Sequence, residues 1–342
     1  MNIIKPGAAY MPHDCTPQQF IERIGRTCYK SEDKITEGSA ERFVAGLIKS
    51  KHWAMLEHET VYTVMEPKLA EIFLLEMFHA NIPTDFLVTT YNGNHLESLP
   101  TVISGSIRAF YDIFSAYYPE HDNDRMPCIA ANWMFGEIKD LYPWAFQDIP
   151  DPLIKVNRNN GSPLNRALTR EQFCERFACE PNILRHHLTH TVKFTVDRGV
   201  THEFCRHRRT SYAMESTRYC NYVKGKYGSE ITVIKPCFYE EGTPAYTEWA
   251  DGCKQAEETY MRLTDQEGLN RKAEEARDNL PHSVKADLIM TATEEQWQHF
   301  IDLRADGTTG KPHPQAQEAA KLWADILEKE SNGRVGSHVK AN

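Results

Sequence analysis

Several features that quickly assign a protein to a class are missing from this sequence of 342 residues. Its nine cysteines are scattered, and no Cys-x-x-Cys pair is present. The first residues, MNIIKPGAAY, contain no apolar core of a signal peptide, and no stretch approaches the roughly 18 apolar residues of a membrane span. These absences favour a cytoplasmic protein with reduced thiols and no membrane partner.

Positive charge is also in deficit, since 48 Asp and Glu residues face 39 Lys and Arg residues, for a net charge of −9. That balance argues against a general nucleic-acid binder. The chain has neither a Walker phosphate loop nor a Gly-x-Gly-x-x-Gly dinucleotide fingerprint. His186 and His190 could share one face of a helix, but no third ligand stands at a telling spacing, so we predict no metal site.

Hydrophobic periodicity predicts helices and strands that alternate without regular βαβ spacing. We therefore expect an α+β fold with a mixed or antiparallel sheet flanked by helices. The run NRNNGSP at 157–163 indicates a loop. Two capping boxes, Thr169 with Gln172 and Thr293 with Gln296, indicate helix starts, and the second helix is expected to run to about 304. Further helices are expected over 17–30, 40–50, 68–80, 106–118, 244–268, 270–279 and 314–329, and strands over 60–65, 85–91, 190–196 and 231–236.

The stretch CRHRRTSYAMESTRYCNY, residues 205–222, concentrates arginines and hydroxyl groups in an acidic chain. Several guanidinium groups that face one point suit a phosphate, because arginine forms paired, charge-assisted hydrogen bonds to phosphate oxygens. The segment ESTRY adds hydroxyl and backbone N–H donors. A solvated basic surface patch is the alternative interpretation, and composition by itself leaves both open.

A second chemical signal lies in EQWQHFIDLRAD, residues 295–306. Trp297, Phe300, Ile301 and Arg304 fall at i, i+3, i+4 and i+7, which places Arg304 on the apolar face of the predicted helix. A buried arginine stays charged and needs an anionic or polar partner. The partner is either an internal carboxylate or a substrate in a pocket.

Four blocks together resemble one family, the flavin-dependent thymidylate synthases. Arg206-His207-Arg208 followed by Ser216 resembles the family signature. HWAMLEH (52–58) resembles its His-x-x-x-x-Glu-His block, and EARDNLPHSVKADLIMTA (275–292) resembles its Ala-Arg-x-x-Leu-Pro segment. WQHFIDLRAD, followed by HPQAQE (313–318), is similar to its arginine-containing C-terminal helix. The resemblance covers about 20–65 and 190–330, in order.

The resemblance implies the fold of that family and a methyltransferase that converts dUMP to dTMP. The one-carbon unit would come from methylenetetrahydrofolate, and NADPH would supply reducing equivalents through bound FAD. It also implies a homotetramer whose active sites lie where subunits meet. Residues 1–342 would then form one domain, with 66–189 a large family-variable insertion.

The resemblance also assigns roles residue by residue. Arg304 matches the arginine that engages the uracil ring and is the implied catalytic residue. No cysteine is needed as nucleophile, and we interpret Cys205 and Cys220 as small buried hydrophobic residues. The implied dUMP-binding residues are Glu203, Arg206, Met214, Glu215, Ser216, Thr217, Arg218, Arg277 and Arg304. The implied FAD-binding residues are His52, Ala54, Arg206, His207, Arg208, Thr293, Glu295 and His299.

The chain departs from the family pattern at several of these positions. A hydroxyl residue is common where Ala54 stands, and Asn and Arg are frequent where Thr293 and Glu295 stand. Met214 replaces a polar residue of the signature. Two alternatives therefore remain beside the thymidylate synthase: a related flavoenzyme that modifies another pyrimidine nucleotide, and a non-catalytic protein that binds a nucleotide or flavin.

Overall fold

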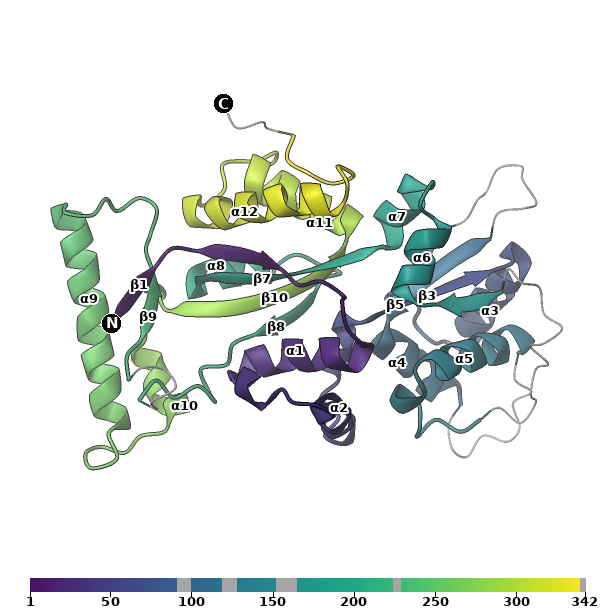
Figure 1. Cartoon of the computed structure of the whole chain (residues 1–342), viewed down its shortest axis with the longest axis horizontal. Helices are drawn as coiled ribbons and strands as arrows, with labels where there is room; N and C mark the ends of the chain where they lie inside the picture. Colours follow the sequence, from purple (N-terminus) through teal and green to yellow (C-terminus); the bar gives the residue numbers. More distant parts are fainter. Residues whose placement is uncertain (91–99, 119–127, 152–164, 224–228, 339–342) are drawn as a thin grey trace. The chain divides into compact units, whose positions relative to one another are not determined.

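The computed structural model describes residues 1–90, 100–118, 128–151, 165–223 and 229–338. The chain divides into two compact units, unit 1 with residues 1–40 and 190–342 and unit 2 with residues 41–189 (Figure 1). The proposed insertion 66–189 lies inside unit 2, which itself begins earlier, at Glu41. That 66–189 is an insertion relative to a family stays a prediction, as does the description of the whole chain as one domain.

Unit 1 is organised around a four-stranded sheet in the order β2-β7-β10-β8. The pairs β2–β7 and β8–β10 are antiparallel, whereas a separate small sheet pairs β1 and β9 in parallel. The arrangement joins the start of the chain to its second half. The strands of unit 1 are β1 (Asn2–Ile4), β2 (Gly7–Tyr10), β7 (Thr189–Asp197), β8 (Ser211–Met214), β9 (Thr232–Ile234) and β10 (Lys285–Thr293).

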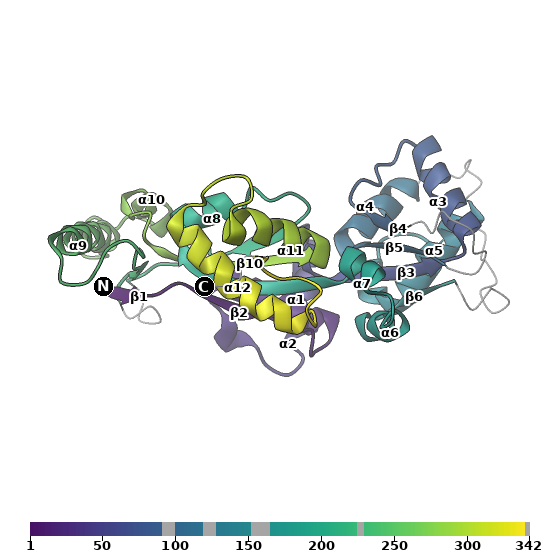
Figure 2. The same cartoon turned by 90° about the horizontal axis from the view of Figure 1, so that it is seen from above.

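Helices cover both faces of the four-stranded sheet. Figures 1 and 2 show α11 and α12 on one face and α1 on the other. Between the sheet and α11 and α12 lies an aromatic core in which Phe194, Trp297 and Trp323 are fully buried. The helices of unit 1 are α1 (Pro17–Tyr29), α8 (Arg198–Phe204), α9 (Pro244–Thr264), α10 (Ala273–Ala276), α11 (Glu294–Ile301) and α12 (Pro314–Glu330).

Unit 2 is built on an antiparallel sheet in the order β4-β5-β3-β6. Its central strand β3 is buried at every residue. Tyr62 and Val64 pack with α6 and α7 on one face, and alternation turns Val61 and Thr63 to the other. The strands are β3 (Thr60–Met65), β4 (Val88–Thr90), β5 (Thr101–Ser106) and β6 (Arg166–Leu168).

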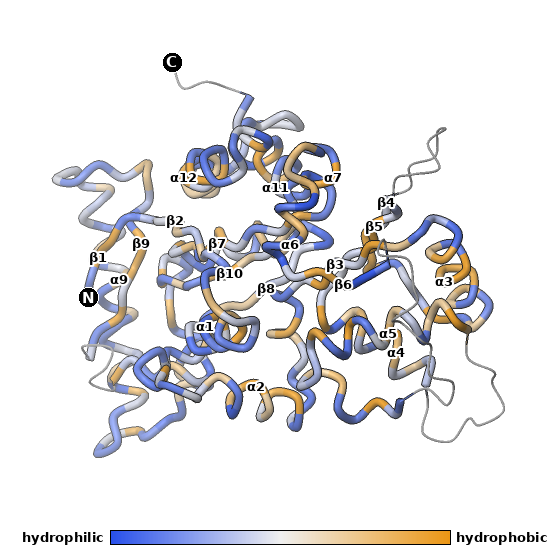
Figure 3. The backbone as a smooth tube through the Cα atoms, turned by 45° about the vertical axis from the view of Figure 1, so that its right-hand side comes forward, coloured by the Kyte–Doolittle hydropathy of each residue, from blue (hydrophilic) through white to orange (hydrophobic). Residues whose placement is uncertain are grey.

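Helices therefore supply the apolar surfaces that bury the sheet of unit 2, and Figure 3 shows hydrophobic residues along β5 and α3. Phe73 of α3, Phe110 and Phe114 of α4 and Phe135 of α5 are fully buried. The helices are α2 (Ser39–Lys49), which begins at the boundary with unit 1, α3 (Pro67–His79), α4 (Ile107–Tyr117), α5 (Ile129–Leu141), α6 (Arg170–Arg176) and α7 (Pro181–His187).

Most predicted elements are confirmed, including both capping boxes, at Thr169 with Gln172 and at Thr293 with Gln296. The expected α+β class is confirmed in its coarse form, as helices combined with several small sheets. The predicted loop at 157–163 lies outside the described residues. The periodicity did not indicate β1, β2, β5, β6, β8, β10, α5 or α7.

The strand predicted at 190–196 is confirmed within β7: Val192, Phe194 and Val196 are buried on one face, and Lys193 and Thr195 on the alternate face are partly exposed.

Four predictions were wrong in detail. The strand predicted at 85–91 is, within the described residues, only β4. The strand predicted at 231–236 is shorter in the structure, where it is β9. The helix predicted over 270–279 is only α10 followed by a 3-10 turn, Arg277–Asn279. The helix expected to reach 304 changes at Asp302 into a π-helical turn, Asp302–Asp306.

Candidate active site

The arginine-rich stretch follows α8 as a tight turn before β8. Asp197 caps α8 by accepting a hydrogen bond from Val200 N at 2.9 Å. After the helix ends, the Tyr212 hydroxyl on β8 donates to Phe204 O at 3.1 Å and also contacts His207 O. The backbone of the turn is thus tied to the sheet, although its arginine side chains point into solvent.

Three cations of this turn are exposed. Within the described ranges of the chain, no ion pair engages the guanidinium of Arg206, Arg208 or Arg209. An unneutralised group of three cations in a protein of net charge −9 is a natural site for an anion.

Arg304, Glu203 and His207 form one connected group in unit 1. Arg304 Nη1 donates to Glu203 Oε2 at 2.7 Å, and Arg304 Nη2 donates to Glu203 O at 2.9 Å. Arg304 Nε donates to His207 Nε2 at 3.0 Å, so this ring nitrogen must be the unprotonated one. Burial, and after it the neighbouring Arg304 and His299, lowers the pKa of His207 to about 4.

Arg304 lies in the π-helical turn and is only partly withdrawn from water. Its side chain is 20% exposed, which is less buried than the i, i+7 spacing from Trp297 predicts. Its guanidinium reaches Glu203 on α8 and His207 just beyond that helix. In this structure its anionic partner is the internal carboxylate of Glu203.

The loop after β8 contains the implied nucleotide-binding residues. Glu215 is buried, whereas Met214, Ser216 and Thr217 are partly exposed. The Ser216 hydroxyl accepts a hydrogen bond from Arg218 N at 3.3 Å. Exposed Arg218 approaches Glu274 at 3.5 Å, a surface ion pair that contributes little to stability. Its guanidinium is therefore available to a stronger anion.

The remaining implied residues of unit 1 lie on two elements. Arg277 is exposed in the 3-10 turn after α10, three residues beyond the Glu274 that pairs with Arg218. Thr293 caps α11 and is buried, while Glu295 is exposed in the first turn of that helix. Exposed His299 lies one turn further, its ring centroid 6.1 Å from that of His207. The structure thus brings His299, His207, Arg304 and Glu203 together.

The last two implied residues belong to unit 2. His52 precedes, and Ala54 lies within, the short 3-10 helix Trp53–His58. His52 is exposed and Ala54 partly buried. Their role toward FAD stays a prediction.

Cys205 and Cys220 differ in environment. Cys220 is fully buried, as expected, but Cys205 is exposed. The interpretation of Cys205 as a small buried hydrophobic residue was therefore wrong: it is the C-cap of α8 and lies at the surface end of that helix.

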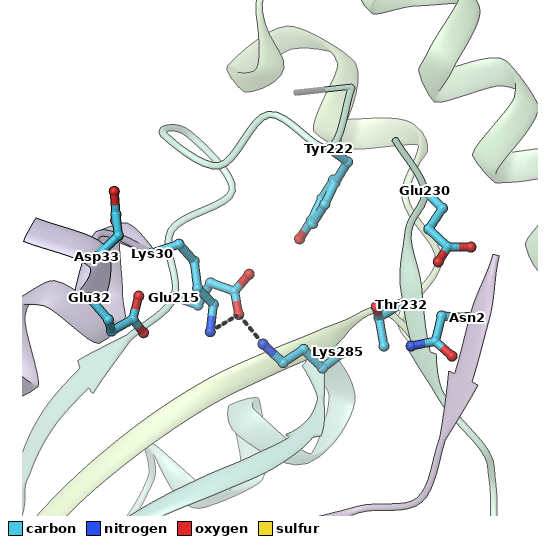
Figure 4. Close-up of a pocket in the computed structure, with 9 residues that line it drawn as sticks. All are labelled: Asn2, Lys30, Glu32, Asp33, Glu215, Tyr222, Glu230, Thr232 and Lys285. Atoms are coloured by element: carbon cyan, nitrogen blue, oxygen red, sulfur yellow. Dashed lines mark hydrogen bonds and ion pairs between the residues drawn. The ribbon is translucent and has the colours of Figure 1, made fainter. Parts of the chain in front are cut away.

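A group of charged residues that the motifs did not indicate lies beneath the loop of Glu215. Lys30, Glu215 and Lys285 line a cleft of about 560 Å³ together with Asn2, Glu32, Asp33, Tyr222, Glu230 and Thr232 (Figure 4). Asp287 completes the group, since it contacts both lysines. The i, i+2 spacing of Lys285 and Asp287 places both on one face of a strand, but β10 itself was not predicted.

Two kinds of feature are absent from the described residues. Among the residues that the structure describes, no three His, Cys, Asp or Glu side chains are grouped so that they could hold a metal ion. Within the same ranges, no helix has the length and hydrophobicity needed to cross a bilayer.

Sequence comparisons give family relationships for the second half of the chain. A family model described as thymidylate synthase complementing protein matches residues 182–331. The flavin-dependent thymidylate synthase of Pyrococcus furiosus is 30% identical over 119 residues, which is 33% of this chain and 46% of that protein. The enzyme of the same name from Mycolicibacterium vanbaalenii is 29% identical over 122 residues, 32% of this chain and again 46% of the relative. The matches thus span about half the length of these relatives.

A comparison of solved structures finds PolB from Streptomyces cacaoi, a UMP/dUMP methylase bound with 5-Br UMP. It is 20% identical, covers 48% of this chain and 82% of its own, and superposes with a TM-score of 0.36, too low to support any argument about this chain. The family relationship therefore depends on the sequence matches. Residues 182–331, which contain the arginine-rich signature and Arg304, match the thymidylate synthase complementing protein family. The predicted resemblance to flavin-dependent thymidylate synthases is confirmed by this match and by the named relatives.

Proposed function

We propose that this protein is a flavin-dependent thymidylate synthase that reductively methylates dUMP to dTMP. Methylenetetrahydrofolate is the proposed one-carbon donor, NADPH the reductant and FAD the cofactor. The fold of that family, with unit 2 as an elaboration, belongs to the same proposal.

The observation that carries the proposal is the exposure of Arg206 and Arg208 without an ion pair to the described residues. Both are exposed, and neither forms an ion pair within the described part of the chain. Exposure alone does not distinguish these arginines, because Arg262 is also exposed and its printed partner is the hydroxyl of Thr259. What distinguishes them is that Arg206, Arg208 and Arg209 gather three guanidinium groups within four residues of the matched segment. Arginines left open within a matched family signature are better explained by an anionic ligand.

The donor set around this turn fits the diphosphate of FAD. Arg206, Arg208 and Arg209 supply fixed positive charge, and the neighbouring His207 and His299 supply aromatic edges with hydrogen-bonding nitrogens. Because its pKa is lowered to about 4, His207 is neutral at physiological pH and accepts from Arg304. Reduced flavin, when bound, supplies hydride chemistry that no side chain provides.

The nucleotide phosphate is assigned to Arg218 and Arg277. Arg218 has a weak contact with Glu274 and lies over the ring of Tyr219, and among the described residues the ion pair of Arg277 is with Asp278, at 4.0 Å. Ser216 and the backbone N–H groups of its loop add neutral donors. A phosphate dianion would draw both arginines away from these surface carboxylates, because its charge and bidentate geometry make stronger hydrogen bonds.

Arg304 is the proposed catalytic residue. Its guanidinium stays charged and is directed by His207 through Nε. When its two Nη groups leave Glu203 for the uracil ring, they stabilise negative charge that develops on N3 and O4, and C5 becomes nucleophilic. Glu203, released from Arg304, is then free to accept from the nucleotide. A homotetramer with shared active sites is part of the proposal, as the resemblance implies.

One assay tests the proposed function. Purified protein, reconstituted with FAD, is incubated with dUMP, methylenetetrahydrofolate and NADPH, and the nucleotide product is identified by mass. We expect dTMP, together with a flavin absorption spectrum and a tetramer on gel filtration. Product from another pyrimidine nucleotide but not from dUMP would contradict the substrate assignment. A protein that binds dUMP but never flavin would contradict the reaction itself.

A further inference from the structure

Two buried carboxylates and two partly buried lysines alternate in sign beneath the loop of residues 214–218. Lys285 Nζ lies 2.7 Å from Glu215 Oε2 and 2.9 Å from Asp287 Oδ2. Lys30 Nζ contacts Asp287 Oδ2 and lies 3.5 Å from the same Glu215 oxygen. Figure 4 shows both lysines directed at Glu215 from opposite sides. We call these four residues the charge tetrad.

Stability alone is a poor explanation for the charge tetrad. The Glu215 and Asp287 side chains are only 2% and 5% exposed. The desolvation of buried charges largely offsets their mutual attraction, so buried ion pairs contribute little net stability compared with apolar residues of similar size. What such groups can provide is a unique arrangement of the segments that carry them.

The backbone around the tetrad shows which segment is held. Glu215 N donates to Asp287 O at 2.9 Å, and Asp287 N donates to Glu215 Oε2 at 3.3 Å, so the two residues bond reciprocally. Ser216 N donates to Cys28 O at 3.2 Å. Arg198 Nη2 donates to Glu215 O at 3.0 Å. The start of the loop is therefore fastened to β10, to the end of α1 and to α8.

Lys30 connects α1 to this arrangement. It is the C-cap of α1 and adopts a left-handed backbone conformation, φ 48° and ψ 52°. This conformation ends the helix while its side chain reaches Asp287. Thr195 Oγ1 donates to the other oxygen of Asp287 at 2.9 Å, which adds β7 to the elements joined at this point.

We propose that Lys30 and Lys285 are positioning residues for the nucleotide: through Glu215 and Asp287 they hold the 214–218 loop in the conformation that presents Ser216 and Arg218 to the phosphate. The inference rests on the proposed function for the identity of the ligand. The ordering of the loop is independent of that identity. Neither lysine needs to touch the nucleotide.

The first test measures loop order directly. Lys30→Met removes the ammonium but keeps most of the side-chain length. We expect hydrogen exchange in a peptide covering 214–222 to accelerate about tenfold. The reason is that loss of one charge-assisted contact lowers the equilibrium constant for the ordered loop about tenfold. Lys30→Arg should restore slow exchange. Lys30→Gln replaces Lys30→Met if the latter does not fold.

The matched control is Lys235→Met. Lys235 belongs to the same unit and also forms an ion pair of 2.8 Å, with Glu241, but neither residue contacts the loop. This variant should leave exchange in 214–222 unchanged. If Lys30→Met lowers the melting temperature and leaves exchange in 214–222 no faster than in the control, the tetrad is only a structural ion-pair cluster and the inference is wrong.

The second test links loop order to the nucleotide. In Lys30→Met we expect the KM for dUMP to rise about tenfold while kcat stays within about threefold, and Lys30→Arg should recover most of the affinity. A fall in kcat with unchanged KM would overturn the positioning role. Wild-type protein that does not methylate dUMP would refute the proposed function instead, and the exchange measurement would still decide whether the tetrad orders the loop.

Discussion

Arg304 and Glu203 hold each other through two hydrogen bonds, one from Nη1 to the Glu203 carboxylate at 2.7 Å and one from Nη2 to the Glu203 carbonyl at 2.9 Å. Both residues are implied to bind the same nucleotide. In the structure each occupies the hydrogen-bonding groups that the other would offer to the ligand. The pair thus keeps a charged arginine satisfied, and in the proposed mechanism the nucleotide replaces Glu203 as its partner.

Replacement of Arg304 should separate catalysis from stability. Arg304→Ala is expected to abolish nearly all turnover while the protein still folds and binds FAD, because the lost contact strengthens as charge develops on the pyrimidine. Arg304→Lys keeps the charge without the planar pair of donors and should be partly active. Turnover and melting temperature are measured on the same sample.

Arg334→Ala is the matched control for Arg304. Arg334 pairs with buried Glu294 at 2.7 Å and is similarly withdrawn, at 17% exposed. Its loss should lower the melting temperature and leave the turnover of folded protein near normal. If Arg304→Ala behaves in the same way, Arg304 is only an internal salt-bridge partner of Glu203.

Removal of Arg206 or Arg218 should weaken nucleotide binding. Each alanine substitution deletes a charge-assisted contact of about 1.5–3 kcal/mol, which corresponds to roughly ten- to a hundred-fold in the dissociation constant of dUMP. Titration calorimetry provides the measurement, and Arg262→Ala, on the exposed face of α9, provides a control of equal charge change. Unchanged affinity in both variants would identify the stretch as a plain surface patch.

Neither Cys205 nor Cys220 is expected to act as a nucleophile. Alanine at either position should leave turnover within a few-fold, although the Cys220 variant loses buried volume and is expected to melt earlier. Loss of all activity in Cys205→Ala, with flavin still bound, would instead indicate a covalent mechanism through this exposed thiol.

Unit 2 should respond to pH through Glu59. Burial, only partly offset by Arg170, raises the pKa of this carboxyl to about 8 from 4.5. Between these values the folded state holds the proton more tightly than the unfolded state. The stability that protonated Glu59 contributes is therefore complete below pH 4.5 and is lost as the pH rises to 8.

Glu59→Gln mimics the protonated form and tests this dependence. We expect it to raise the free energy of unfolding at pH 8 by roughly 2–4 kcal/mol and to change it little at pH 4. Chemical denaturation at both pH values, with exposed Glu71→Gln as the control, gives the comparison. Equal effects of Glu59→Gln at pH 4 and pH 8 would contradict a raised pKa.

The candidate site could be predicted from the sequence where its residues stand in short motifs. Arg206-His207-Arg208 and Arg304 stand in blocks that the sequence alone separates from background, and their family relationship is confirmed over 182–331. Lys30, Lys285 and Asp287 escaped notice because no local pattern connects them. Lys30 is the C-cap of α1. Lys285 and Asp287 lie on β10, which is buried at nearly every residue. That strand was not predicted from the sequence.

The amino-acid sequence by itself determined the helices and strands whose patterns depend on residues close together in the chain. Capping at Thr293 and Gln296 and the apolar spacing of α1 and α12 depend on neighbours within a few residues, so they can be read without the fold. Only the tertiary structure decided that Arg304 pairs with Glu203 and that Lys30 meets Asp287. These contacts join residues far apart in the chain, and whether a charge meets a carboxylate or a ligand depends on which elements pack together.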